Sequence, residues 1–199
     1  LMSEFKKAMQ NYANYVVKEA RNNLAKEGKA GGQLDKSLGF ELKQNRGSKG
    51  KFESGYNVEF FMEDYGIYQD LGVKGIGGQR KTGKNKGVAF ENKGKGGKFQ
   101  FRKGVPNRSM IKSLNTWIKR KGIKGRNQKT GRFITDQSLS FAIAKSVFHT
   151  GIKRSLFFSK PFEAGITKYD NDIANAYGND IIKELIKWVQ LLEQDHPIL

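Results

Sequence analysis

The sequence has no cysteine, and only two histidines and three prolines among its 199 residues. Without cysteine the chain has no disulfide, thiol nucleophile or cysteine-ligated zinc, and we expect an intracellular origin. His149 falls near the end of an expected helix, where a lone histidine is more often a surface or capping residue than a general base. No apolar run approaches the ~20 residues that a helix needs to cross a bilayer, so we expect no contact with a membrane.

Acidic residues are scarce in the middle of the chain. Residues 73–132 contain 19 lysines and arginines but a single acid, Glu91, so this block carries +18, the formal charge of the whole protein. The remainder has 18 bases and 18 acids and is neutral. So dense a block between balanced segments indicates a polyanion or an acidic partner surface. The alternative is a solvated segment that keeps the protein soluble.

The apolar pattern predicts an α+β fold, with a small antiparallel sheet packed by long N- and C-terminal helices. We expect a single domain, residues 1–199, with a basic Gly/Lys-rich loop insertion at about 73–132 and extra middle helices. Apolar residues at steps of three and four predict a helix over 3–27 and a last helix over about 168–194. The last helix is expected beside the first one or against a neighbouring subunit.

Alternating apolar residues predict the sheet. The segments 38–43 and 56–62 both show the period of two that is typical of strands, and we expect an antiparallel hairpin. A turn over 31–37 should lead into the hairpin, and a helical turn over 65–72 should close it. We expect a further strand within 152–162 that completes the sheet.

The middle of the chain combines loops and helices. Residues 74–98 lack apolar periodicity and are expected to form a loop, after which Phe99 resumes a strand. An apolar face predicts a helix over 106–121, with Pro106 at its start. Another helix is expected from a capping Asp136 to a terminating Gly151.

The sequence offers few residues that could converge to form a catalytic site. The only cluster of carboxylates is Glu59, Glu63, Asp64 and Asp70, which fits a solvated strand face and turn better than a metal-dependent nuclease. The glycines of 75–79 lack the Gly-Lys-Ser/Thr ending and βαβ context of a phosphate loop. We therefore expect no enzymatic activity, no metal and no cofactor.

The basic block instead predicts contact with phosphates or with an acidic partner, independent of base sequence. Long cationic side chains on glycine-rich backbone can follow a phosphate chain without reading bases. No aromatic residue lies between Val73 and Ala89, which argues against stacking of single-stranded bases. The expected contact residues are Lys74, Arg80, Lys81, Lys84, Lys86, Lys93, Lys95, Lys98, Arg102, Lys103, Lys124, Arg126, Lys129 and Arg132.

Three separated motifs resemble one known family. They are Gly32-Gln33-Leu34-Asp35-Lys36-Ser37-Leu38, Tyr65-Gly66-Ile67-Tyr68-Gln69-Asp70-Leu71-Gly72 and Lys160-Pro161-Phe162-Glu163-Ala164-Gly165-Ile166. In this order, after a long first helix, they resemble the head–tail connector and tail-completion (neck) proteins of tailed bacteriophages, related to the minor tail component of lambda-like phages. The chain departs from that pattern in its basic insertion, its extra middle helix and Val73 after Gly72.

The resemblance implies a non-enzymatic virion protein that is made in the host cytoplasm and forms a ring of six or twelve copies in the neck. Its partners would be portal or adaptor and tail proteins, with double-stranded DNA in the channel. The basic loops would line that channel or grip an acidic neighbouring ring. Tyr65, Tyr68 and Phe162 would lie at or near a subunit interface, with core packing as the alternative. The competing hypothesis is a sequence-independent DNA-binding protein, such as a packaging factor or small nuclease.

Overall fold

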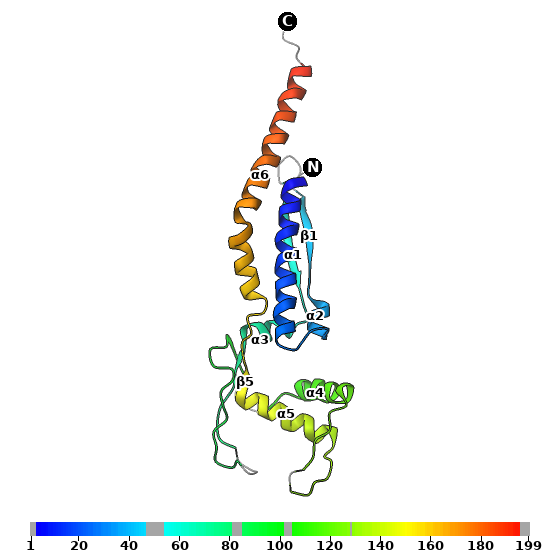
Figure 1. Cartoon of the computed structure of the whole chain (residues 1–199), viewed down its shortest axis with the longest axis vertical. Coiled ribbons are helices and arrows are strands. Elements are labelled where there is room, and N and C mark those ends of the chain that lie inside the picture. The colour runs from blue at the N-terminus through cyan, green and yellow to red at the C-terminus, as the bar shows by residue number, and fades with distance from the viewer. Residues whose placement is uncertain (1–2, 47–53, 81–84, 102–104, 128, 196–199) are drawn as a thin grey trace. The chain divides into compact units, whose positions relative to one another are not determined.

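The computed structural model describes residues 3–46, 54–80, 85–101, 105–127 and 129–195 (Figure 1). These residues form six helices and five strands. The helices are α1 (Ser3–Lys26), α2 (Gln33–Ser37), α3 (Gly66–Leu71), α4 (Arg108–Lys121), α5 (Asp136–Thr150) and α6 (Ser159–Asp195). The strands are β1 (Gly39–Arg46), β2 (Ser54–Phe61), β3 (Val73–Lys74), β4 (Phe99–Gln100) and β5 (Gly151–Ile152). The predicted α+β class, with its small antiparallel sheet and long terminal helices, is confirmed.

The chain divides into two compact units. The first consists of residues 1–66 and 156–199, and the second of residues 67–155. The second unit holds 22 of the 37 basic residues and 3 of the 19 acids, a net charge of +19, which leaves −1 for the first unit. The predicted insertion at 73–132 therefore falls wholly within the second unit. That the chain forms a single domain stays a prediction.

The first unit is built on α1, which lies between α6 and the β1–β2 hairpin (Figure 1). The helices α1 and α6 run antiparallel. Phe5, near the start of α1, donates a hydrogen bond to Asp180 in the second half of α6, whereas Asn23, near the end of α1, donates one to Phe157 just before α6 begins. The buried core of this unit comprises Val17, Ala20, Leu24, Leu34, Leu38 and Phe157. The apolar stripe predicted for the first helix is thus buried in the core, as expected for residues that share one face of a helix.

The predicted hairpin is confirmed. Strands β1 and β2 pair antiparallel, with Phe40 opposite Phe60 and Leu42 opposite Val58. Because successive side chains of a strand alternate between faces, these two pairs lie on one face of the hairpin. That face packs on α1, where the ring of Tyr12 lies edge-on to Phe60 with 6.1 Å between centroids.

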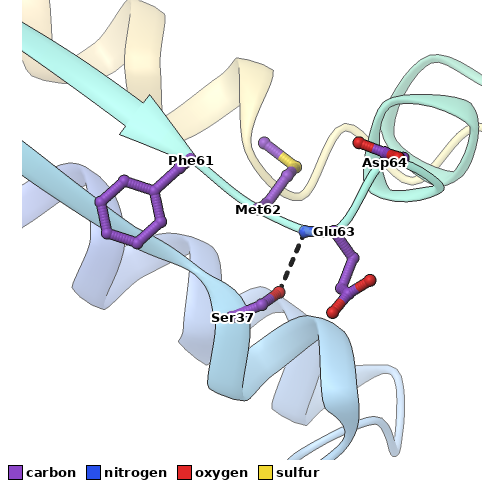
Figure 2. Close-up of a pocket in the computed structure, with 5 residues that line it drawn as sticks. All are labelled: Ser37, Phe61, Met62, Glu63 and Asp64. Carbon is purple, nitrogen blue, oxygen red and sulfur yellow. Dashed lines mark hydrogen bonds between the residues drawn. The ribbon is translucent and has the colours of Figure 1, made fainter.

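The chain enters the hairpin through the short helix α2, where the sequence predicts only a turn over 31–37. Leu34 and Leu38 are both buried, and a helical turn brings residues four apart to the same side. The Ser37 hydroxyl accepts the Glu63 N–H at 3.0 Å (Figure 2). It also donates to the Leu34 carbonyl at 3.0 Å. The helix α2 therefore ties the start of the hairpin to the segment that follows its second strand.

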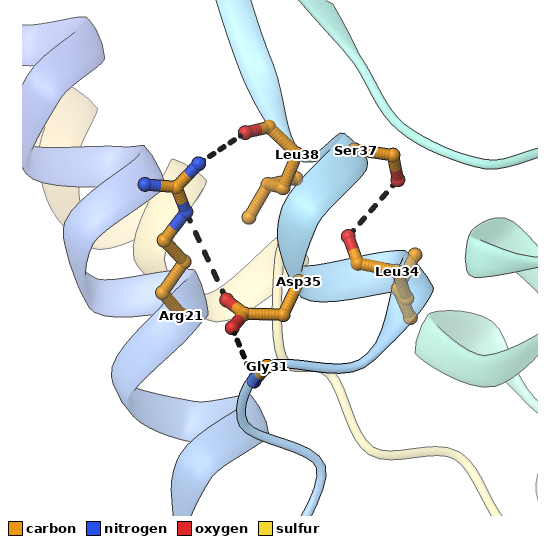
Figure 3. Close-up of polar contacts among 6 residues, drawn as sticks. All are labelled: Arg21, Gly31, Leu34, Asp35, Ser37 and Leu38. Carbon is orange, nitrogen blue, oxygen red and sulfur yellow. Dashed lines mark hydrogen bonds and ion pairs between the residues drawn. The ribbon is translucent and has the colours of Figure 1, made fainter.

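Arg21 on α1 holds α2 in place (Figure 3). Its Nη2 donates to the Leu38 carbonyl at 2.8 Å, and its Nε lies 3.8 Å from Asp35 Oδ1. The other Asp35 oxygen accepts the Gly31 N–H at 2.7 Å. Backbone groups on both sides of α2 are thus satisfied by one arginine and one carboxylate, which makes the corner a defined structure.

The strand predicted within 152–162 is wrong. Only Gly151–Ile152 is extended, and it pairs with β3 of the second unit, so that it adds nothing to the hairpin. The last helix begins at Ser159, nine residues before the predicted start at 168. The apolar run that suggested a strand leads into this helix, and its Phe157 is completely buried in the core.

The first turns of α6 explain why this helix packs closely on α1. Pro161 lies in the first turn, where the N–H that proline lacks has no helical partner. Gly165 faces α1, and a Cβ at this position would lie 2.9 Å from the Tyr12 ring and 3.1 Å from Val16. Glycine at 165 therefore permits an approach that any larger residue would block.

The first turn of α1 receives its cap from α6. Asp180 is buried, and its Oδ2 accepts the Phe5 N–H at 2.9 Å. N–H groups of a first helical turn lack partners within the helix, and a carboxylate there also meets the positive end of the helix dipole. Beside it, hydrogen bonds from Lys183 and then Asn179 lower the pKa of the Glu4 carboxyl.

The second unit contains the remaining sheet and two packed helices. Strand β3 lies between β4, to which it is parallel, and β5, to which it is antiparallel. Helix α4 packs against α5, and Ile118 and Ala144 are fully buried.

Both predicted middle helices are confirmed, but their caps differ from the prediction. Asn107, rather than Pro106, precedes α4, and its side chain accepts two N–H groups of the first turn. Thr135, rather than Asp136, caps α5 by accepting the Ser138 N–H. A short polar side chain just before the first helical residue is the usual N-cap, so each predicted start is off by one or two residues.

The Asp180 cap predicts a measurable loss of stability. Asp180→Ala should destabilise the first unit by about 1.5–3 kcal/mol, because the buried Phe5 N–H loses a charged acceptor. Asp172→Ala removes the same charge from an exposed position of α6 and should change stability by less than about 0.5 kcal/mol. Urea unfolding followed by far-ultraviolet circular dichroism compares the two. Equal stability of both variants would contradict the capping role.

Candidate functional site

The long basic loop, residues 75–98, connects β3 to β4, and these two strands are neighbours in the sheet. Strands β3 and β4 lie side by side, with Val73 opposite Phe99, which confirms that a strand resumes there. Near the end of the loop, the Gly94 N–H donates to the Thr150 carbonyl at 3.0 Å. The base of the loop is therefore held by backbone hydrogen bonds.

Two glycines allow the loop backbone to pack directly on this sheet. A Cβ at Gly94 would lie 1.9 Å from the Val73 carbonyl oxygen, and one at Gly75 would lie 2.2 Å from the His149 carbonyl oxygen. Both distances are far inside van der Waals contact, so no side chain fits at either position. Some of the glycines of this loop thus have a packing role.

The described part of the loop folds back on itself. Gln79 and Ala89 form an antiparallel bridge, and the Arg80 N–H donates to the Val88 carbonyl at 2.9 Å. Backbone pairing of this kind leaves no apolar periodicity in the sequence, so the sequence predicts only a loop over 74–98.

A stack of three side chains fixes the loop to the end of α5. The Arg80 guanidinium lies 4.9 Å from the Phe90 ring centroid, and that ring stacks on the His149 imidazole at 4.4 Å with 5° between the planes. His149 Nδ1 lies 2.6 Å from the Gly77 carbonyl oxygen. Within the described residues His149 therefore holds the loop, and it belongs to no cluster of acidic or imidazole groups.

A second basic hairpin spans residues 123–135. Arg126 and Phe133 form an antiparallel bridge, and the Arg126 guanidinium lies 4.5 Å from the Phe133 ring centroid. The Asn127 side chain accepts two N–H groups of the tip, at 2.9 and 3.2 Å. Each basic loop is thus stabilised by a cation–π contact between an arginine on its first half and a phenylalanine on its second half, Arg80 with Phe90 and Arg126 with Phe133. Such a contact contributes about 0.5–1 kcal/mol at exposed sites.

The predicted contact residues that the structure describes are all exposed. They are Lys74, Arg80, Lys86, Lys93, Lys95, Lys98, Lys124, Arg126, Lys129 and Arg132. The other four predicted contact residues, Lys81, Lys84, Arg102 and Lys103, lie outside the described residues. The structure brings the described cations together in one unit, on two hairpins and the strands that carry them.

Ion pairs are distributed unevenly between the two units. Among the described side chains there are six, and five of them lie in the first unit. The sixth joins Lys124 to Asp136, with 3.3 Å between Nζ and Oδ1. No other described cation of the second unit has a carboxylate within ion-pair distance. The positive charge of this unit is therefore not neutralised internally.

Helix α4 carries five further cations that the predicted contact set omits. They are Arg108, Lys112, Lys119, Arg120 and Lys121, and all are exposed. The signal that identifies the first three is their spacing, because steps of four and seven residues place side chains on one face of a helix. The apolar face of this helix predicts the helix but does not point to these cations.

The four carboxylates that are clustered in the sequence have different surroundings. Glu59 pairs with Lys43 across the hairpin at 2.6 Å. Glu63 and Asp64 line a shallow surface pocket of about 260 Å³ (Figure 2). The described part of the chain contains no group of three or more histidines and carboxylates that could hold a metal. Glu59 and Asp64 are exposed and Glu63 is half-buried, as expected for a strand face and turn, whereas Asp70 is buried and does not fit the expected solvated position.

The three predicted interface residues have different surroundings. Tyr65 and Tyr68 are 43% and 45% exposed, and the Tyr68 ring lies 4.9 Å from that of Phe99. Phe162 is half-buried in the first unit, with its ring 5.9 Å from that of Phe60. Core packing thus accounts for Phe162, while the tyrosines remain accessible. A role at a subunit interface stays a prediction for all three.

Comparisons with protein-family models, with curated proteins and with solved structures find no match to this chain. Over the described ranges, no helix combines the length and the apolarity needed to cross a bilayer. The resemblance to neck proteins therefore stays an inference from the three sequence motifs.

The packing role of Gly94 can be tested by adding one methyl group. Gly94→Ala should destabilise the second unit by about 1–3 kcal/mol, because its Cβ meets fixed backbone. Gly178→Ala adds the same methyl group to α6 where nothing lies within 4 Å, and it should stabilise the helix by about 0.5–1 kcal/mol. Thermal unfolding and the rate of tryptic cleavage within the basic loop report the effect. Wild-type stability and cleavage in Gly94→Ala would contradict the close packing.

Proposed function

We propose that this chain is a structural, non-enzymatic subunit of the head–tail neck of a tailed bacteriophage. It is made in the host cytoplasm and assembles in the virion as a ring of six or twelve copies between portal or adaptor and tail proteins. The order of the motifs at 32–38, 65–72 and 160–166 supports the proposal. These motifs correspond to α2, to α3 and to the start of α6, and they follow the order of long helix, hairpin and final helix that the family pattern implies.

The observation that carries the proposal is the division of charge between the two units. The second unit has a net charge of +19 and the first has −1. A ring subunit of the neck has one part that meets its neighbours and another that meets the polyanion in the channel or an acidic ring. A nearly neutral unit suits contact with copies of itself, and a unit with unpaired cations suits a polyanion.

The distal part of α6 supports assembly. Asp180 and Lys183 already contact the first turn of α1, so α6 continues beyond the end of its partner helix (Figure 1). The following side chains are between 48% and 59% exposed: Ile182, Leu185, Ile186, Trp188, Val189 and Leu191. Contiguous apolar surface of this kind marks protein contacts, and head-to-tail contacts between copies can close a ring.

A second candidate is a sequence-independent DNA-binding protein, such as a packaging factor. The same unpaired cations favour it, because they would bind the phosphates of any duplex. The two candidates differ in assembly, since a free DNA-binding protein needs no closed ring.

Ring formation is tested directly on the full chain. Electron microscopy and analytical ultracentrifugation should show closed rings of six or twelve copies with a DNA-wide channel, alone or with portal and tail proteins. Leu185→Glu with Val189→Glu should abolish assembly, because charges enter the exposed apolar face of α6. Val105→Glu, at an exposed position of the second unit, should assemble normally. A protein that is monomeric alone and joins neither portal nor tail would contradict the proposal.

DNA binding by the isolated protein tests the second candidate. Replacing Lys81, Lys84, Lys86, Lys93 and Lys95 with glutamine should make the negative slope of log affinity against log salt shallower by about 4 to 5, if each lysine neutralises one phosphate. The matched control neutralises five exposed lysines of the first unit: Lys7, Lys18, Lys26, Lys36 and Lys160. Fluorescence anisotropy with a labelled duplex measures both. An unchanged affinity in the loop variant would exclude the loop lysines as the DNA contact of the second candidate.

A further inference from the structure

The groove between α4 and α5 combines positive charge with a defined shape. Its volume is about 830 Å³, and Arg108, Lys112 and Lys119 line its α4 side. At about 1.5 Å of rise per residue these three cations extend over roughly 16 Å of helix, on one face. These three side chains therefore form a cationic row along the groove, and are not scattered over the surface.

The row is not neutralised by the residues around it. None of the three cations has a carboxylate within ion-pair distance among the described residues. Asp136 also lines the groove, but its Oδ1 already pairs with Lys124 at 3.3 Å. Cations along a groove with low-dielectric walls concentrate the positive potential in the space between the helices.

The position of Arg108 runs against what helix stability favours. It is the first residue of α4, where the helix dipole favours acids, and the first turn contains none. The Asn107 cap and the left-handed Gly122 hold both ends of α4 in place regardless. A residue that opposes a local preference in a well-formed element is expected at a functional position.

The chemistry of the lining distinguishes between possible partners. Ile111 is the one apolar residue among those that line the groove, whereas protein interfaces usually have an apolar or aromatic centre. Asn115 and Gln137 supply amide groups that can donate to phosphate oxygens. Among the described residues, no aromatic ring lines the groove, so it offers single-stranded bases no stacking platform. A polar, cationic lining of this kind is typical of contacts with the backbone of duplex nucleic acid.

We propose that the α4–α5 groove binds the phosphate backbone of double-stranded DNA, with Arg108, Lys112 and Lys119 as its principal contacts. This inference deepens the proposed function, because it rests on the second unit facing DNA. The DNA contact then lies on α4, a helix that is capped at both ends. The two basic hairpins, which precede and follow α4 in the sequence, add further cations. The contact is independent of base sequence, since the three side chains meet only phosphates.

The test neutralises the row in the full chain. In the triple variant Arg108→Gln, Lys112→Gln, Lys119→Gln, the negative slope of log affinity against log salt should become shallower by roughly 2 to 3 for duplexes of any sequence. Lys7→Gln, Lys18→Gln, Lys26→Gln removes the same charge from the first unit and should leave the slope unchanged. A third variant, Arg108→Lys, Lys112→Arg, Lys119→Arg, keeps the charge and should bind like the wild type. Circular dichroism verifies that each variant is folded.

Four results would overturn the inference. They are a wild-type slope in the neutralised variant, an equal loss in the first-unit control, no duplex binding by the wild-type chain, and tighter binding of polyglutamate than of duplex. The last result would identify an acidic protein as the partner. Electron microscopy of the same variants separates this inference from the proposed function. Normal rings with unchanged DNA affinity refute the groove alone, whereas altered affinity without any ring refutes the neck assignment alone.

Discussion

Repulsion between like charges is the main constraint on the folding of the second unit. Its 22 basic residues accompany 3 acids, of which Asp70 is buried and Asp136 is paired with Lys124. The remaining cations repel one another, and this repulsion destabilises a compact state. A polyanion that binds the folded unit would relieve the repulsion and add stability through mass action. The first unit, with nearly balanced charge and most of the ion pairs, has no such constraint.

The second unit folds in spite of this repulsion through contacts that do not depend on charge balance. Backbone hydrogen bonds hold the long loop at its base, and Gly75 and Gly94 allow backbone to lie directly on backbone. Arg80 and Arg126 each lie over a phenylalanine ring, which places two cations in favourable contacts without any carboxylate. The described cations of the predicted contact set stay exposed, where water and salt screen them.

Periodic features could be predicted from the sequence, and features created by tertiary contact could not. The stripe on α1 and the alternation in β1 and β2 each bury one face, so their periods gave the correct elements. Helix α2 was missed because five residues carry little periodic signal, although the four-residue spacing of Leu34 and Leu38 is helical. The stack of Phe90 on His149 joins residues far apart in sequence, and no local pattern encodes it. The α4–α5 groove likewise exists only once the two helices pack.

The central claim, that the second unit meets duplex DNA and the first does not, is tested most directly by acetylation footprinting. Lysines of the full chain would be acetylated with and without a duplex and their labelling compared by mass spectrometry. The account predicts protection of lysines within residues 67–155, in the loops and on α4, with unchanged labelling of lysines in the first unit. Protection spread evenly over both units, or confined to the first, would contradict it.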